Sequence, residues 1–189
     1  MRLQDKSYEY IKGEVADLLF RYGIKQIPVS GIELAGKMGI KLIPYSSLSD
    51  GKLTAAKAVS PDGFYFEPGE SMECIYYDDT KPARRLNMTI MHEIGHAVLG
   101  HDENTDPEIA EAEAGFFAKY ILAPTPLIDC LHPCNAFEVA IVFGMSSQAA
   151  NYSFSNWQKR VAFGPQKPMY YETLILRQFK EVMPMGSKK

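Results

Sequence analysis

The stretch that decides the fold is Thr89-Ile90-Met91-His92-Glu93-Ile94-Gly95-His96, which contains the pattern HExxH. Two histidines four residues apart lie on one face of a helix, so both imidazoles can reach a single zinc ion. Glu93 projects roughly 100° around the helix from His92, where its carboxylate can hold a water without ligating the metal. Zinc lowers the pKa of a bound water to about 7, and a neighbouring carboxylate can take its proton. The motif therefore predicts zinc ligands at His92 and His96, with Glu93 as general base.

The sequence around the motif predicts a core helix from about Ala83 to Leu99, ended by Gly100. HExxH also occurs by chance on exposed, charged helices. Here the apolar residues recur at helical spacing and give the helix a buried face: Ile90, Ile94, Ala97 and Val98. This burial favours the metal-site interpretation.

A zinc site needs a third protein ligand, and Glu113 is the best candidate. It belongs to a helix expected from Asp106-Pro107 to about Leu122, on a stripe that is otherwise apolar or aromatic: Ile109, Ala112, Phe116, Phe117 and Tyr120. A carboxylate on such a face is costly unless something pairs with it. The first helix rises roughly 6 Å over the four residues from His96 to Gly100, and the second rises roughly 9 Å over the six from Pro107 to Glu113. If the second helix folds back antiparallel to the first, Glu113 therefore lies level with the histidines. Glu111 falls on the opposite side and is expected to be solvated.

His101 is the alternative third ligand, nine residues after His92. The metzincin pattern requires Gly seven and His ten residues after the first His, but Leu99 and Asp102 occupy those positions. We therefore expect His101 to complement the helix dipole or to hydrogen-bond a metal ligand. The donor that stabilises an oxyanion stays open among five residues: Tyr76, Tyr77, Tyr120, His101 and His132.

Short elements precede the motif. Helices are expected at Tyr8–Tyr22 and Gly31–Met38, followed by a strand at 40–43. Turn signals then separate three short segments, which predict a small antiparallel sheet: 55–59, 63–66 and 73–77. Cys74–Tyr77 is the expected edge strand for an extended substrate, although a plain core strand fits equally well.

The C-terminal part is predicted to be helical, from Ala136 to Val161 with a break at Gly144. The sequence Met145-Ser146-Ser147 resembles the turn of a helix-turn-helix. Its second helix, 147–157, carries no Lys or Arg, which favours packing or protein docking over DNA reading. A last helix is expected at 170–182. The expected organisation is a zincin-like core (1–128), a helix-turn-helix-like segment packed on it (135–165) and a tail (166–189).

Composition sets further limits. The 189 residues carry a net charge of −3 without a basic cluster, which argues against a dedicated nucleic-acid-binding protein. Three cysteines do not make a disulfide framework, and we see no signal peptide or membrane span. We therefore expect a cytoplasmic protein. Cys130-Leu131-His132-Pro133-Cys134 lacks the spacing of a zinc knuckle and a fourth ligand nearby, so an ordinary loop is the default interpretation.

The motif, together with two downstream stretches, resembles the ImmA/IrrE metallopeptidase family. The downstream stretches are Glu113-Ala114-Gly115-Phe116-Phe117-Ala118 and Ile121-Leu122-Ala123-Pro124, and the resemblance extends over most of residues 10–165. It implies that His92, His96 and Glu113 bind zinc and that Glu93 is the general base.

The expected fold is therefore α+β: a minimal zincin with a small sheet, an HExxH helix, a Glu-bearing helix and C-terminal helix-turn-helix-like helices. The expected reaction is zinc-dependent hydrolysis of a peptide bond. The resemblance implies that the substrate is a helix-turn-helix repressor of a mobile element or a stress response. The alternative is a non-catalytic, zinc-ordered binding module that acts as an anti-repressor or a toxin–antitoxin component.

Overall fold

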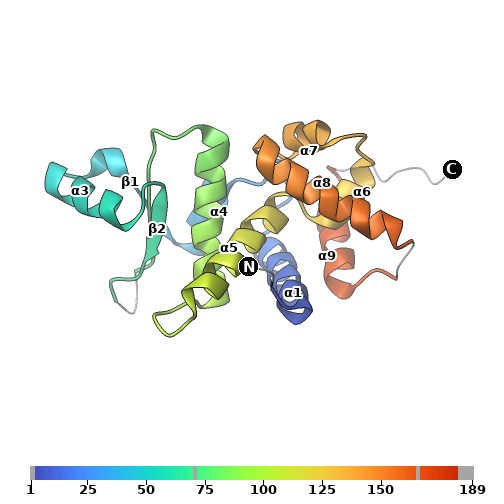
Figure 1. Cartoon of the computed structure of the whole chain (residues 1–189), viewed down its shortest axis with the longest axis horizontal. Helices are drawn as coiled ribbons and strands as arrows, with labels where there is room; N and C mark the ends of the chain where they lie inside the picture. Colours follow the sequence, from blue (N-terminus) through green and yellow to red (C-terminus); the bar gives the residue numbers. More distant parts are fainter. Residues whose placement is uncertain (1–2, 70–71, 165–166, 183–189) are drawn as a thin grey trace. The chain divides into compact units, whose positions relative to one another are not determined.

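The computed structural model describes residues 3–69, 72–164 and 167–182. The chain forms two compact units. Ser30–Ala118 builds the first, and Gln4–Val29 with the chain from Lys119 onward builds the second. Helix α5 (Pro107–Leu122) contributes residues to both (Figure 1). Among the described residues, no helix combines the length and the apolar character that a membrane span requires.

The first unit contains a three-stranded sheet with helices on it. Its elements before α5 are α2 (Gly31–Met38), β1 (Lys41–Pro44), the 3-10 turn η1 (Tyr45–Ser47), α3 (Asp50–Val59), β2 (Gly63–Phe66), β3 (Cys74–Tyr77) and α4 (Ala83–Leu99). The strand order is β1-β3-β2. β2 pairs antiparallel to β3, and β1 pairs parallel to it. The fold class is α+β as predicted, but the sheet is mixed rather than antiparallel.

Two predictions about this sheet are wrong. Residues 55–59, expected as a strand, form the second half of α3. Their sequence is rich in Ala and Lys, which are strong helix formers. Cys74–Tyr77 is the central strand with partners on both sides, so of its two interpretations the core strand is confirmed and the edge strand is wrong. The free edges therefore belong to β1 and β2.

Helix α4 packs on the sheet through its apolar face. Ile90, Met91 and Ile94 are fully buried, as is Ile75 of β3. Figure 1 shows the sheet between α3 and α4. Burial of each such side chain contributes about 1.5–3 kcal/mol, so these contacts fix α4 against β2 and β3. The predicted bounds of α4, Ala83–Leu99, are those observed.

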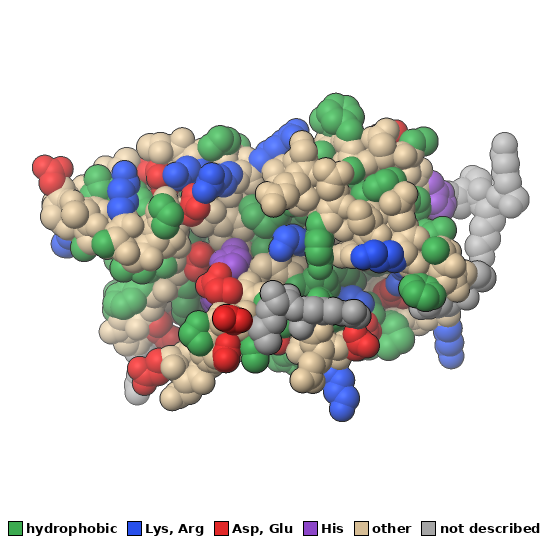
Figure 2. Space-filling view, in the orientation of Figure 1, with side chains coloured by type: hydrophobic (Ala, Val, Ile, Leu, Met, Phe, Trp, Pro, Cys, Tyr) green, Lys and Arg blue, Asp and Glu red, His purple; other side chains and the backbone are tan. Residues whose placement is uncertain are grey.

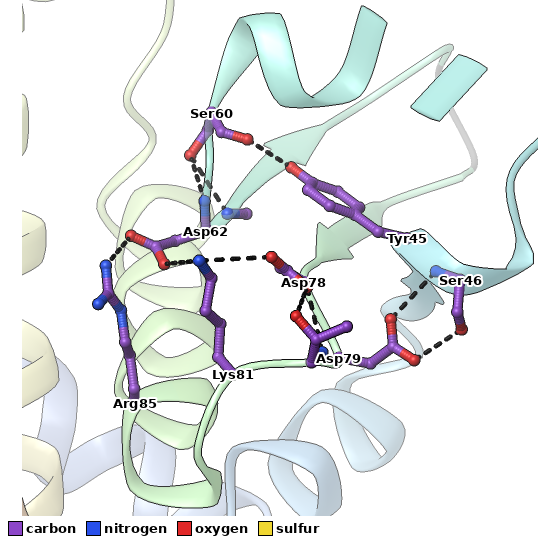
Figure 3. Close-up of polar contacts among 10 residues, drawn as sticks. Tyr45, Ser46, Ser60, Asp62, Asp78, Asp79, Lys81 and Arg85 are labelled. Carbon is purple, nitrogen blue, oxygen red and sulfur yellow. Dashed lines mark hydrogen bonds and ion pairs between the residues drawn. The ribbon is translucent and has the colours of Figure 1, made fainter. Parts of the chain in front are cut away.

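A polar network joins the start of α4 to the ends of β2 and β3 (Figure 3). Arg85 of α4 donates to Asp62 at 2.7 Å, and Lys81 lies 3.7 Å from Asp62 and 3.4 Å from Asp78. Asp78 is buried and accepts the Thr80 hydroxyl at 2.6 Å, the main cause of its lowered pKa. Exposed ion pairs stabilise little on their own. A buried aspartate that loses its partners costs more, so the network fixes the start of α4 near β2.

The second unit is helical: α1 (Asp5–Arg21), α6 (Thr125–Leu131), α7 (Ala136–Val142), α8 (Ser147–Ala162) and α9 (Tyr170–Gln178). The predicted helical pair with a break at Gly144 is present as α7 and α8, and α8 is capped by the Ser146 hydroxyl. Helix α6 runs into the loop expected at Cys130–Cys134, since it ends at Leu131. It begins with Thr125-Pro126, and Pro is tolerated in a first helical turn.

Helix α1 packs against α9. The Tyr171 hydroxyl donates to Glu9 at 2.6 Å across that contact. The sequence-based division placed α1 in the peptidase core, whereas in the structure it joins the C-terminal helices. Residue 165 of the predicted helical segment, and residues 166 and 183–189 of the predicted tail, lie outside the described residues.

Candidate metal centre

The two motif histidines converge as their spacing predicts. On α4 the Nε2 atoms of His92 and His96 lie 3.1 Å apart. Both rings are partly buried. Figure 2 shows histidine side chains flanked by acidic side chains on the visible face of the molecule. One turn of helix therefore presents two nitrogens to one point.

Glu111 completes the cluster. Its two carboxylate oxygens lie 3.3 Å from His92 Nε2 and 3.5 Å from His96 Nε2. Among the described residues, these three side chains form the one group of His, Cys, Asp or Glu whose ligand atoms converge, all within 4.8 Å of one another. The expectation that Glu111 faces away from the site is wrong, although its side chain is 67% exposed.

The packing of α5 on α4 explains which glutamate reaches the histidines. The two helices approach closely at Gly95, where an added Cβ would lie 3.2 Å from the Ala114 Cα and 3.0 Å from the Phe117 ring. Glu111 precedes Ala114 by three residues, about one turn, so it lies on the same side of α5. Glu113 is about 200° around the helix from Glu111 and takes a different place.

The spacing of the three ligands fits a tetrahedral zinc ion. Bonds of about 2.0–2.1 Å to nitrogen or oxygen place two ligands of a tetrahedron roughly 3.3–3.4 Å apart. The distances among the three side chains, 3.1, 3.3 and 3.5 Å, lie around that value. Two imidazoles and one carboxylate also form the donor set of many catalytic zinc sites, which leave a fourth position for water or substrate. The residues therefore fit the metal.

Behind this cluster lie His101 and Glu113. His101 Nδ1 is 2.9 Å from His96 Nδ1, and His101 Nε2 is 3.2 Å from a Glu113 oxygen. Gly100, with φ of 67°, ends α4 in the left-handed conformation, and the next N–H, that of His101, bonds to the His96 carbonyl at 3.1 Å. This turn directs the His101 ring back onto His96. Glu113, predicted as the third ligand, thus contacts His101, and His101 contacts a motif histidine.

Glu93 lies between α4 and the outer edge of β2. Its side chain is buried, with 7% of the residue exposed, and the Tyr65 N–H donates to its Oε2 at 2.9 Å. Burial raises the pKa of this carboxyl to about 8; the Tyr65 hydrogen bond opposes the shift and the Glu111 charge adds to it. In the metal-free protein the carboxyl therefore keeps its proton at neutral pH, whereas a cation bound nearby would favour the ionised form.

His96 is held neutral. Burial lowers its pKa to about 4, and the neighbouring His92 and His101 add to the shift while Glu111 opposes it. A neutral imidazole keeps a lone pair for a metal. The site therefore needs little proton release from His96 to bind a cation.

Four more residues were predicted as possible oxyanion donors: Tyr76, Tyr77, Tyr120 and His132. Tyr76 stacks on Phe64 with ring centroids 5.0 Å apart. Burial raises the pKa of Tyr77. Tyr120 and His132 belong to the second unit. Cys130 and Cys134 are free thiols, half-buried and exposed, and neither belongs to a converging metal-ligand group among the described residues.

An α+β fold that presents an HExxH helix and a carboxylate from the next helix defines a minimal zincin-like protein. The sequence model of the IrrE N-terminal-like domain, peptidase family M78, matches residues 42–155. The chain therefore belongs to this peptidase family, as its motifs indicated. Searches of curated proteins and of solved structures gave no match.

Proposed function

We propose that the protein is a zinc-dependent endopeptidase in which His92, His96 and Glu111 bind the metal and Glu93 is the general base. The observation that carries the proposal is the convergence of these three ligands beside a buried carboxylate. Glu111 takes the role that the sequence assigned to Glu113. When bound, zinc would polarise the scissile carbonyl and make a water acidic enough to attack at neutral pH.

Glu93 carries the proton through the reaction. It removes a proton from the attacking water as the new C–O bond forms at the carbonyl carbon. It then gives this proton to the leaving nitrogen as the C–N bond breaks. A bound cation would favour the ionised form of this carboxyl, which is the form that accepts the proton. The Tyr65 N–H holds one of its oxygens in place, which leaves the other for the proton.

An extended peptide would bind along β2. This strand is at the edge of the sheet, and its Tyr65 N–H already faces Glu93. A peptide that added to this edge would run past the base and the ligand cluster, and it would pair with backbone groups of the edge other than the Tyr65 N–H, which donates to Glu93. This assignment replaces the predicted role of Cys74–Tyr77, whose edges are both paired.

The proposed substrate is a cytoplasmic helix-turn-helix repressor of a mobile element or a stress response. Membership of the family supports this choice. In the competing proposal, the same metal-ordered site binds the repressor without cutting it. The two proposals differ in whether the Glu93 carboxylate is needed to relieve repression.

The test compares the zinc-loaded protein with Glu93→Gln, using as substrate a helix-turn-helix protein encoded next to the gene. Both proteins should retain about one zinc per chain and bind the repressor in a pull-down. Cleavage should fall at least 10²–10⁴-fold in the variant, the usual contribution of general-base catalysis. Equal relief of repression in cells by both proteins would favour the binding module. Failure of the unmodified protein to bind added zinc would refute the metal assignment.

A further inference from the structure

Two groups behind the ligand cluster, Glu113 and His101, form a continuous chain of hydrogen-bonding atoms with the ligand His96. Glu113 Oε2 lies 3.2 Å from His101 Nε2, and His101 Nδ1 lies 2.9 Å from His96 Nδ1. The other nitrogen of His96 faces His92 and Glu111. The His101 side chain is only 7% exposed, so its ring is held by these partners rather than by solvent.

The carboxylate decides where the protons lie in this chain. A carboxylate only accepts hydrogen bonds, so the His101 nitrogen that faces Glu113 must carry the proton. A neutral His101 then has a lone pair at Nδ1, which accepts a hydrogen bond from the Nδ1–H of His96. His96 in this tautomer has its lone pair at Nε2, the atom that faces His92 and Glu111.

The opposite arrangement would block the site. If His101 carried its proton at Nδ1, its Nε2 lone pair would face the Glu113 carboxylate. His96 would then have to accept at Nδ1 and carry its own proton at Nε2. That proton would point at the other ligands, and the nitrogen could not bind a metal.

We propose that Glu113 and His101 are positioning residues that fix the tautomer and the ring orientation of His96 for metal binding. The proposal deepens the proposed function, since it concerns the same metal centre. It also gives a role to a buried histidine and a carboxylate that the reaction itself does not use. Loss of a group that orients a metal ligand typically costs 10–100-fold in metal affinity.

The first measurement is zinc affinity, from competition with a chromogenic chelator, for variants at position 101. His101→Leu removes the acceptor for His96 and should weaken binding 10–100-fold. His101→Asn offers a carbonyl oxygen to the His96 Nδ1–H and should recover part of the loss. Glu108→Gln, an exposed change in the first turn of α5, is the matched control and should leave affinity unchanged.

The second measurement is the tautomer of His96 in the zinc-free protein, from long-range ¹H–¹⁵N correlations above the ordinary pKa of histidine. The unmodified protein should show the Nδ1–H form. In Glu113→Leu the two tautomers of His96 should be mixed, because no carboxylate then holds the proton of His101 on Nε2. Glu108→Gln should match the unmodified protein.

Either of two results would overturn the proposal: wild-type zinc affinity in His101→Leu, or a pure Nδ1–H tautomer of His96 in Glu113→Leu. If the unmodified protein binds no zinc, the proposed function fails, and the tautomer measurement still decides the positioning role. Circular dichroism and urea unfolding in chelator identify any variant that does not fold. The tautomer is then read from Glu113→Gln, whose amide oxygen still accepts from His101 and should preserve the Nδ1–H form.

Discussion

Replacement of Glu93 by Gln should stabilise the metal-free protein. In the folded state, burial raises the pKa of Glu93 to about 8, whereas the ordinary value is 4.5. Between these two values the unfolded chain has lost this proton and the folded chain has kept it. Folding is therefore progressively penalised as pH rises from 4.5 to 8. Gln is neutral in both states and escapes the penalty, and its amide oxygen can still accept from the Tyr65 N–H.

The size of this effect follows from the pKa. At pH 7 the unfolded carboxyl is about 2.5 pH units above its pKa, and each unit is worth about 1.36 kcal/mol, so Gln gains roughly 3 kcal/mol. For a chain of this length that gain corresponds to roughly 6–12 °C in melting temperature. The gain should vanish below about pH 4, where both states hold the proton, and level off above pH 8.

The assay is urea unfolding in chelator across this pH range for both proteins. Glu103→Gln, at an exposed loop position, is the control and should change stability by less than about 0.5 kcal/mol. Equal stability of Glu93→Gln and the unmodified protein at pH 7 would refute the raised pKa of the buried Glu93 carboxyl. A difference that did not change with pH would show that the stabilisation has another origin.

Three further predictions concern the metal centre. Gly95→Ala should destabilise the protein by about 1–3 kcal/mol and weaken zinc binding, because the new methyl group meets Ala114 and the Phe117 ring. Urea unfolding measures the loss of stability, and zinc titration measures the loss of affinity. Glu111→Gln should weaken zinc binding more than Glu113→Gln in a chelator competition, and the reverse order would return the third-ligand role to Glu113. Zinc at 100 times its dissociation constant should add about 2.7 kcal/mol to the free energy of unfolding, and an unchanged transition would contradict a folded-state site.

The elements that carry the site could be predicted because their signals are local. Gly100 ends α4 and Asp106 precedes α5, so both helices were expected with bounds close to those observed. The position of His92, Glu93 and His96 on one helix follows from the helical period alone. For α4 and α5, local sequence was therefore sufficient.

The third ligand depends on how two helices pack, and local sequence does not specify this. A shift of two residues along α5 exchanges Glu111 for Glu113. The apolar stripe around Glu113 correctly indicated a less exposed carboxylate, but its partner is His101. The pairing of Gly95 with Ala114 was the available signal: small residues mark where helices approach closely, and Glu111 is one turn before that point.

The sheet was mispredicted for a related reason. Short apolar runs fit a strand or a helix, and the chain from 55 to 59 became α3 through its Ala content. The parallel pairing of β1 with β3 joins segments that are more than thirty residues apart. The identity of the edge strand, and with it the proposed substrate edge at β2, follows only from that long-range pairing.

The most direct test of the central claim is a crystal structure of zinc-loaded Glu93→Gln, with anomalous diffraction recorded on both sides of the zinc edge. The account predicts one zinc peak bound by His92 Nε2, His96 Nε2 and a Glu111 oxygen at about 2.0–2.2 Å. It also predicts that His101 lies between His96 and Glu113 without touching the metal. A peak coordinated by Glu113 or His101 in place of Glu111, or no peak at the two motif histidines, would contradict it.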